Sequence, residues 1–337
     1  MTRALLLIAA LASAAHADVW SDAIERGSAD SSRDRYAAAL QEGDALAQRA
    51  NAKNIGVRTA ASLIDQAVRA YKVAADARPK EGEPWFRIAS VLESYFTDCG
   101  PLMMQRPVTC PPSQAYRIDP ARAKEAVDAW DEFEARAPLD PRIAESLFAR
   151  AILRTKLVTG GKDAKAHLEG ALRDYTALLD RADGLTLLRL DQVWGNLAET
   201  YMMLGKLDDA IDAYQVALDK GAGSSTAYGK AVALDRDERT TEALDLIRRQ
   251  GVRAFEEYRE DLSLGAVFYV PPGEEQYYFA LIYEALGYNA EAIAAWNAFI
   301  KSGAHPQYHA RAKWHLEQLA KKPVTRPRTL DPFDVYP

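Results

Sequence analysis

One spacing recurs five times along this chain of 337 residues and limits what it can fold into. A small residue is followed four positions later by an aromatic residue and three positions after that by an apolar or small residue. The instances are Ala67-Tyr71-Ala74, Ala126-Trp130-Phe133, Ala171-Tyr175-Leu178, Ala210-Tyr214-Ala217 and Ala292-Trp296-Phe299. Offsets of four and seven place all three side chains on one face of an α-helix, where the small residue lets a second helix approach closely. The pattern therefore predicts an all-α chain of packed helices.

A partner helix precedes the fourth of these units. Its apolar face carries Trp194, Leu197, Ala198 and Tyr201, and Gly205 stands where the chain must turn. This order resembles the tetratricopeptide repeat, whose first helix carries Trp, Leu, a small residue and Tyr, and whose second carries Ala, an aromatic residue and Ala. The same register recurs at Phe279, Ala280, Tyr283, Gly287, Ala292 and Trp296. Over roughly residues 60 to 304, the resemblance implies an α-solenoid of antiparallel helix hairpins.

Two stretches interrupt the repeat, and the chain ends in segments of different composition. The expected organisation is a signal peptide at 1–17, a helical N-terminal cap at 18–56, a helical array at 57–321 and a Pro-rich tail at 322–337. Within the array we expect an insertion at about 97–119 and a loop at about 251–273. The insertion contains four prolines, which favour loop over helix.

The N-terminus predicts export. Arg3 precedes an apolar run over 4–12, and Ala15-His16-Ala17 is the small-x-small pattern that a signal peptidase accepts. We therefore expect cleavage after Ala17 and a periplasmic or secreted protein. Asp18 stands where a lipoprotein would need Cys, and no later apolar run has the length of a membrane span, so neither a lipid anchor nor a span is predicted. In an oxidising compartment, Cys99 and Cys110 are expected to form a disulfide.

Charge and motifs argue against several classes of function. The 42 basic and 48 acidic residues leave a formal charge of -6, which does not favour nucleic-acid binding. His305 and His309 are four apart, but no Cys, Asp or Glu within 305–315 completes a metal site. Glu145-Ser146 resembles a catalytic pair of wall-cleaving enzymes, yet it falls inside a repeat helix. We therefore predict no metal, no cofactor and no catalytic residues.

The resemblance implies a concave groove that holds a protein or peptide partner, lined by first-helix positions that are not used for packing. Counting from the Trp-like position gives the candidate groove residues Phe86, Glu93, Arg142, Glu145, Gln192, Glu199, Met202, Tyr277 and Glu284. Acids outnumber bases in this set. We therefore expect a groove of negative potential with Phe86, Met202 and Tyr277 exposed, suited to an extended partner that is basic or mixed apolar and basic.

Other interpretations of the same residues stay open. The acids could be ordinary solvated charges on an acidic protein. A second candidate function is a solute-binding accessory protein, in which the cysteine insertion and the 251–273 loop close over a small molecule beside Tyr269, Tyr277 and Tyr278. An envelope enzyme is the third. The favoured function is an exported interaction scaffold.

Overall fold

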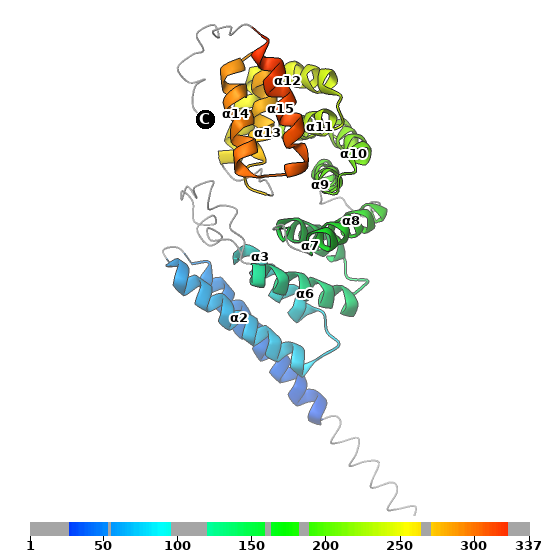
Figure 1. Cartoon of the computed structure of the whole chain (residues 1–337). Helices are drawn as coiled ribbons and strands as arrows, with labels where there is room; N and C mark the ends of the chain where they lie inside the picture. The colour runs from blue at the N-terminus through cyan, green and yellow to red at the C-terminus, as the bar shows by residue number, and fades with distance from the viewer. Residues whose placement is uncertain are drawn as a thin grey trace, which may run out of the picture. The chain divides into compact units, whose positions relative to one another are not determined.

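The computed structural model describes residues 27–52, 55–95, 120–158, 163–181, 189–263 and 271–322, and every regular element within these ranges is a helix (Figure 1). The chain divides into two compact units. One consists of Met1–Tyr95 with Asp128–Asp140, and the other of Phe96–Val127 with Pro141–Pro337. The predicted all-α class is confirmed for the part of the chain that is described.

The helices have the following bounds. The first unit contains a helix over 27–50, α2 (Val57–Ala77), α3 (Glu83–Tyr95) and the second half of α6 (Pro120–Arg136). The second unit contains α7 (Ile143–Lys156), α8 (Ala164–Asp180), α9 (Leu190–Met203), α10 (Leu207–Asp219), α11 (Ser224–Arg236), α12 (Thr240–Ser263), α13 (Glu275–Leu286), α14 (Asn289–Ser302), the 3-10 turn η2 (Pro306–Tyr308) and α15 (His309–Ala320).

The repeated units form the packing faces of α2, α6, α8, α10 and α14. All three members of each unit are buried, and none of these side chains is more than 2% exposed. Burying a large aromatic side chain of this kind stabilises a fold by about 2 kcal/mol or more. The packing role predicted for the small–aromatic–apolar spacing is confirmed at all five sites.

The second unit is built from four helix hairpins: α7 with α8, α9 with α10, α11 with α12, and α13 with α14. Each hairpin also packs on the next, through α8 with α9, α10 with α11, and α12 with α13. The first helices of successive hairpins contact one another, and α15 covers α14 at the end of the series. This is the order of a tetratricopeptide-type α-solenoid, as the resemblance implied.

Glycines make the tight turns of two of these hairpins. Gly205 follows α9 with φ +74°, and Gly287 follows α13 with φ +86°. This left-handed backbone costs a residue with a Cβ roughly 1 to 2 kcal/mol, and glycine avoids the cost. Gly287 closes the end of α13 through a hydrogen bond from its N–H to the Glu284 carbonyl at 3.2 Å. Both turns lie where the sequence placed them.

The predicted loop at 251–273 is wrong for residues 251–263. Helix α12 continues to Ser263, and Gly251, with φ +76° and ψ 178°, changes its direction without ending it. After the kink, Phe255 and Tyr258 enter the core, and the Phe255 ring meets Phe279 edge to face at 6.1 Å. In the sequence, Gly251 looks like the end of a helix. The apolar residues that follow it keep helical spacing, however, and Phe255 and Tyr258 pack in the core.

In the first unit, the helix over 27–50 runs antiparallel to α2. Ser32 donates to the Ala77 carbonyl at 2.6 Å, and Tyr71 donates to Asp44 at 2.9 Å. Gly43 lies against the Tyr71 ring, where a Cβ would come within 2.3 Å of the ring carbons. The helix therefore pairs with α2 through direct side-chain contacts.

Several predictions fall on residues outside the described ranges. These are the signal peptide at 1–17, the insertion at 97–119 with its Cys99–Cys110 disulfide, and the tail beyond 322. Within the described ranges, no helix combines the length and apolar character needed to cross a membrane.

Candidate functional site

An open cavity of about 670 Å³ lies in the second unit, beside four of the segments that connect its helices. It is lined by the end of α7, the start of α8, the end of α9, the residue Pro271 and the segment between α14 and η2. The lining residues are Val158, Ala164, Lys165, Leu168, Met203, Leu204, Pro271, Gly303, His305, Pro306 and Gln307. The volume falls in the range of small-ligand and peptide-anchor sites, and most of the lining side chains are apolar.

A row of buried charges starts at the His305 wall of this cavity. His305 Nε2 lies 3.2 Å from Glu274 Oε2, and Arg236 Nη2 donates to Glu274 Oε1 at 3.0 Å. The Arg236 guanidinium also lies over the rings of Tyr308 and Tyr277, at 4.3 and 4.9 Å. Burial alone would raise the pKa of Glu274, but the charges of Arg236 and His305 outweigh it and lower that pKa. Glu274 is therefore a buried, ionised and fully paired carboxylate.

Glu199 is placed differently. It lies on α9 one helical turn before Met203, on the same helix face, and its side chain is half-buried. Burial raises the pKa of Glu199 to about 8, and the negative charge of Glu274 contributes to the shift. At neutral pH the Glu199 carboxyl is therefore mostly protonated. It does not supply the negative charge that the sequence predicted at this position.

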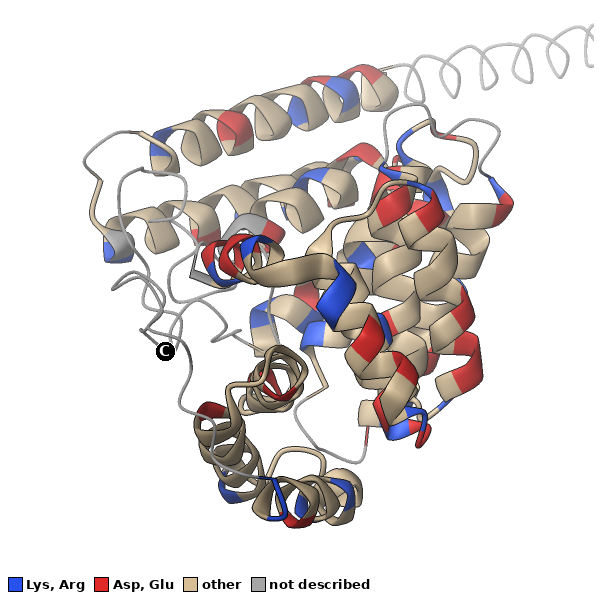
Figure 2. Cartoon of the chain, turned by 90° about the horizontal axis from the view of Figure 1, so that it is seen from above, with Lys and Arg blue, Asp and Glu red and all other residues tan. Residues whose placement is uncertain are grey.

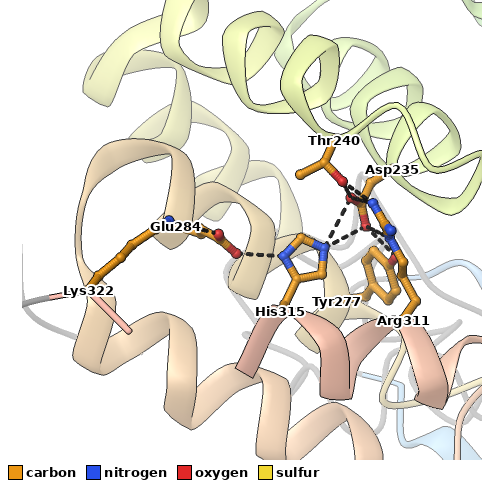
Figure 3. A network of polar contacts seen from close by, with 7 residues as sticks. All are labelled: Asp235, Thr240, Tyr277, Glu284, Arg311, His315 and Lys322. Atoms are coloured by element: carbon orange, nitrogen blue, oxygen red, sulfur yellow. Dashed lines mark hydrogen bonds and ion pairs between the residues drawn. The ribbon is translucent and has the colours of Figure 1, made fainter. Parts of the chain in front are cut away.

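A second network of polar contacts holds α15 against α11 and α13 (Figure 3). At its centre is Asp235, fully buried on α11, which accepts hydrogen bonds from the Tyr277 and Thr240 hydroxyls at 2.6 Å each. Arg311 Nη2 donates to the same carboxylate at 3.0 Å, and His315 Nε2 lies 3.0 Å from both of its oxygens. Burial would raise the pKa of Asp235, but His315 and Arg311 lower it well below the ordinary value.

His315 joins two carboxylates. Its Nδ1 lies 2.7 Å from Glu284 Oε2, and Lys322 Nζ lies 3.3 Å from the other Glu284 oxygen. Because both ring nitrogens face acceptors, both must carry a proton, and the ring is an imidazolium. Burial opposes the charge, but the two carboxylates outweigh it and raise the pKa of His315. The network ties α11, α13 and α15 together through one side chain.

The predicted groove residues fall in both units. Phe86 and Glu93 belong to the first, where the Phe86 ring packs edge to face on Trp130 at 5.4 Å and on Phe133 at 5.2 Å. In the second, Arg142 is the half-buried N-cap of α7, and Glu145 and Gln192 are exposed on α7 and α9. Their contact with a partner stays a prediction.

Three predicted groove residues do not line an open surface. Met202, Tyr277 and Glu284 are only 3%, 0% and 6% exposed. Tyr277 packs between Trp296 at 4.7 Å and Phe299 at 5.0 Å. The predictions that Met202 and Tyr277 are exposed and that Glu284 is a free groove acid are wrong, because each of these side chains is committed to the core or to an ion pair. On α9 it is Met203 that reaches the cavity.

Acids and bases are also mixed along the helices rather than sorted by sign (Figure 2). Glu284 is neutralised by His315 and Lys322, and Glu199 is mostly protonated. Of the acids predicted for the groove in this unit, Glu145 is the one exposed to solvent. The expected groove of negative potential is therefore not supported by these positions.

The Glu145-Ser146 pair does not converge on one site. Ser146 is buried, and its hydroxyl donates to the Ile143 carbonyl at 2.8 Å, whereas Glu145 is exposed. Adjacent helical residues point about 100° apart, so this divergence follows from the helix itself. The two side chains do not form a catalytic pair.

Asp235, Arg236 and His315 were missed from the sequence. A weak signal was present for His315, which lies three residues after Ala312 and four before Leu319, on the buried face of α15. A titratable residue on an apolar helix face needs a buried partner. Its partners lie 80 and 31 positions away in the chain, so no local pattern identifies them.

Comparison with known proteins gives similarity of structure alone. No family model matches the sequence, and no curated protein matches it either. The MamA protein structure shares 16% identity over 70% of this chain and 98% of its own, with a TM-score of 0.44. The structure of PilF of Pseudomonas aeruginosa shares 14% identity over 87% of this chain and 100% of its own, with a TM-score of 0.45.

A thermophilic TPR protein of Thermus thermophilus shares 18% identity over 68% of this chain and 95% of its own, with a TM-score of 0.36. The scores and identities are low for all three. The fold assignment therefore rests on the packed hairpins described above, and those hairpins are of the tetratricopeptide type.

Proposed function

We propose that the protein is an interaction scaffold and that the cavity of the second unit binds an extended segment of a partner polypeptide. The observation that carries this proposal is the cavity itself, about 670 Å³ and open to solvent, with Leu168, Met203 and Leu204 on its wall. Apolar side chains left at an open cavity favour an occupant that covers them from water. Helical repeat arrays commonly use such surfaces to hold another chain.

A small-molecule site of the kind considered from the sequence receives less support. That hypothesis placed the ligand beside Tyr269, Tyr277 and Tyr278, under the cysteine insertion and a loop at 251–273. Tyr277 and Tyr278 are buried in the core, and residues 252–263 are helical. Tyr277 and Tyr278 are therefore already covered by protein side chains, whereas Tyr269 and the insertion lie outside the described residues.

The proposal is tested by filling the cavity. Met203→Arg places a long charged side chain in it, and Thr176→Arg adds the same side chain at an exposed position on the second helix α8, outside the predicted groove. We expect partners captured from the protein's own source by the wild type and by Thr176→Arg to be lost with Met203→Arg. Equal capture by all three would contradict the proposal, and a small molecule in native mass spectra would favour the solute-binding alternative.

We further propose that the scaffold works outside the cytoplasm. The support is the N-terminal sequence, with Arg3, an apolar run over 4–12 and the Ala15-His16-Ala17 pattern. N-terminal sequencing of the protein from a fractionated envelope should find Asp18 first. A chain that keeps Met1 and stays in the cytoplasmic fraction would contradict export while leaving the cavity proposal intact.

A further inference from the structure

The ionisable side chains on the wall of the cavity are all of one kind. Among the described residues that line it, Lys165 and His305 are the ionisable ones, and both are bases. None of these lining residues brings a carboxylate. Lys165 lies in the first turn of α8, and 80% of its side chain is exposed. A ligand in the cavity therefore meets a positive charge at this wall, and a negatively charged group complements it.

The charge of Lys165 is available to such a ligand. Its ammonium group lies 3.7 Å from the Glu169 carboxylate, one helical turn further along α8, and the Glu169 side chain is 48% exposed. An exposed ion pair of this kind adds little stability, because water screens both charges. A carboxylate held in the cavity can therefore share Lys165 with Glu169 or replace Glu169 as its partner.

His305 is held in a backbone conformation that few side chains adopt. Its φ is +42°, in the left-handed region, and Pro306 follows it. In the described part of the chain, Glu238 is the one other residue with a Cβ and a positive φ. Backbone of this kind persists where its surroundings fix it, and such residues cluster at binding sites. The conformation sets His305 into the cavity wall between Gly303 and Gln307.

The two ring nitrogens of His305 have different neighbours. Nε2 lies 3.2 Å from Glu274, which also accepts a hydrogen bond from Arg236, so buried groups hold this side of the ring. Nδ1 lies 3.5 Å from the side-chain nitrogen of Gln307, and Gln307 is exposed. An amide nitrogen and a protonated ring nitrogen are both hydrogen-bond donors. His305 and Gln307 therefore offer donors at the polar part of the wall.

The rest of the wall selects for a second property. Most of the other lining residues are apolar, among them Leu168, Met203 and Leu204. An aliphatic side chain covers such a surface from water, whereas a charged group placed against it would lose hydration without a partner. The cavity is therefore suited to a ligand that carries an acidic group beside an aliphatic one.

We propose that the partner segment bound in the cavity carries an acidic side chain, Asp or Glu, next to an aliphatic one, and that its carboxylate lies beside Lys165, His305 and Gln307. The proposal rests on the proposed scaffold function and adds the chemistry of the partner. Ammonium groups pair with carboxylates, and the neighbouring donors add hydrogen bonds to the same oxygens. The partner's charge is then opposite to the one expected from the groove acids in the sequence.

The test uses the folded full chain and three tripeptides, Leu-Glu-Leu, Leu-Gln-Leu and Leu-Lys-Leu, each acetylated at the N-terminus and amidated at the C-terminus. Both ends are then uncharged, so the peptides differ in the central side chain alone. In ligand-observed NMR titrations at low salt and about pH 7, we expect the Glu peptide to bind about tenfold more tightly than the Lys peptide, with the Gln peptide between them.

The net charge of the protein makes this test stringent. The chain carries a formal charge of -6, so non-specific attraction would favour the Lys peptide. A preference for the Glu peptide must therefore come from a local site. Equal affinity for the three peptides, tighter binding of the Lys peptide, or no binding of the Glu peptide at about 10 mM would overturn the proposal.

Lys165→Gln locates the site. It removes the charge from an exposed side chain, a change that leaves the fold intact, and it should reduce the preference for the Glu over the Lys peptide about threefold. Lys220→Gln is the matched control, because it removes the same charge at an exposed position after α10 that does not line the cavity. The control should keep the wild-type preference, and an equal effect of the two substitutions would overturn the proposal.

His305→Asn tests the second part of the wall. Asn tolerates the left-handed backbone, and Arg236 still pairs with Glu274 in this variant. The affinity for the Glu peptide should fall while the affinity for the Lys peptide does not, and an equal fall for both would overturn the role of His305. If this variant fails to fold, the comparison of Lys165→Gln with Lys220→Gln decides the proposal.

The two proposals fail in different ways. If Met203→Arg loses partner capture but the wild type does not distinguish the Glu from the Lys peptide, the scaffold function stands and the acidic partner is wrong. If the wild type prefers the Glu peptide through Lys165 but cavity filling leaves partner capture unchanged, the acid site stands and the proposed scaffold function of the cavity is wrong.

Discussion

At the scale of single residues, the second unit contains two acids on neighbouring first helices whose pKa values are shifted in opposite directions. Asp235 of α11 is ionised because His315, Arg311 and two hydroxyls surround it, while Glu199 of α9 keeps its proton because burial has no cation to offset it. The difference comes from partners and not from burial, since both lie inside the unit. Each case gives a measurable consequence.

His315→Gln should destabilise the protein strongly. The change leaves the buried carboxylates of Asp235 and Glu284 without their shared cation, and loss of one member of a buried ion pair typically costs roughly 3 to 5 kcal/mol. The control is His309→Gln on the same helix, where the ring contacts one backbone carbonyl at 3.0 Å. Chemical denaturation should separate the two variants, and equal midpoints would contradict a central role for His315.

Stability should fall as pH rises above neutrality, partly because of the same histidine. The pKa of His315 is raised above 6.5 in the folded protein, so the folded state holds its proton more tightly than the unfolded chain does. This contribution is complete below pH 6.5 and is lost as pH rises through the folded-state pKa. Thermal unfolding across this range should show the loss in the wild type and a flatter profile in His315→Gln.

The Glu199 carboxyl should also lower the stability of the folded protein as pH rises, over a lower pH range than His315 does. Its pKa is raised from 4.5 to about 8 in the folded protein, so its contribution is present at low pH and is lost between these values. Glu199→Gln should match the wild type near the acid end of the range and exceed its stability near pH 8. A constant difference between the two proteins across the range would show that the carboxyl titrates normally.

At the scale of helices, the sequence predicts packing faces well and boundaries less well. Tyr214 and Trp296 have small and apolar neighbours at fixed offsets, and that local pattern is enough to bury them. Gly251 shows where local reasoning fails. A glycine with positive φ ends a helix at Gly287, but at Gly251 it joins two helical stretches, because Phe255 and Tyr258 find core partners beyond it.

The backbone role of Gly251 can be tested by comparing two Gly→Ala substitutions. Gly251→Ala should destabilise the protein by roughly 1 to 2 kcal/mol, because φ is +76° and the position is otherwise open. Gly195→Ala, in the middle of α9, should stabilise by about 0.5 to 1 kcal/mol, because a Cβ there would meet only Thr226 at 3.6 Å. Changes of the same sign in denaturation would contradict this assignment of backbone strain.

The candidate site was harder to predict than the fold for a physical reason. Tyr277 and Met202 occupy first-helix positions that are open in a regular repeat, but here α14 and neighbouring hairpins cover them. The His315 network joins residues up to 80 positions apart. Glu199 was predicted as a groove acid, but its protonation depends on burial and on Glu274, which only the assembled helices provide.

At the scale of the whole molecule, helices α9 to α15 of the second unit share one hydrophobic cluster. Buried side chains from Ala198 to Leu319 form it, and the ion pairs of Asp235 and Glu274 join helices within that unit. We expect a fragment of residues 141–337 to fold and to unfold in one cooperative transition. Circular dichroism during heating tests this, and a gradual loss of helix without a transition would contradict it.

The placement of the repeated alanines and aromatic residues determines which positions of the chain can be substituted without disturbing the packing. In the second unit the repeated pattern lies on second helices, whereas Glu145 and Gln192 are exposed on first helices. Substitutions at those two positions leave the hairpin contacts intact. Because packing and exposure are separated in this way, the first helices are where new recognition can evolve or be engineered without changing the repeated packing faces.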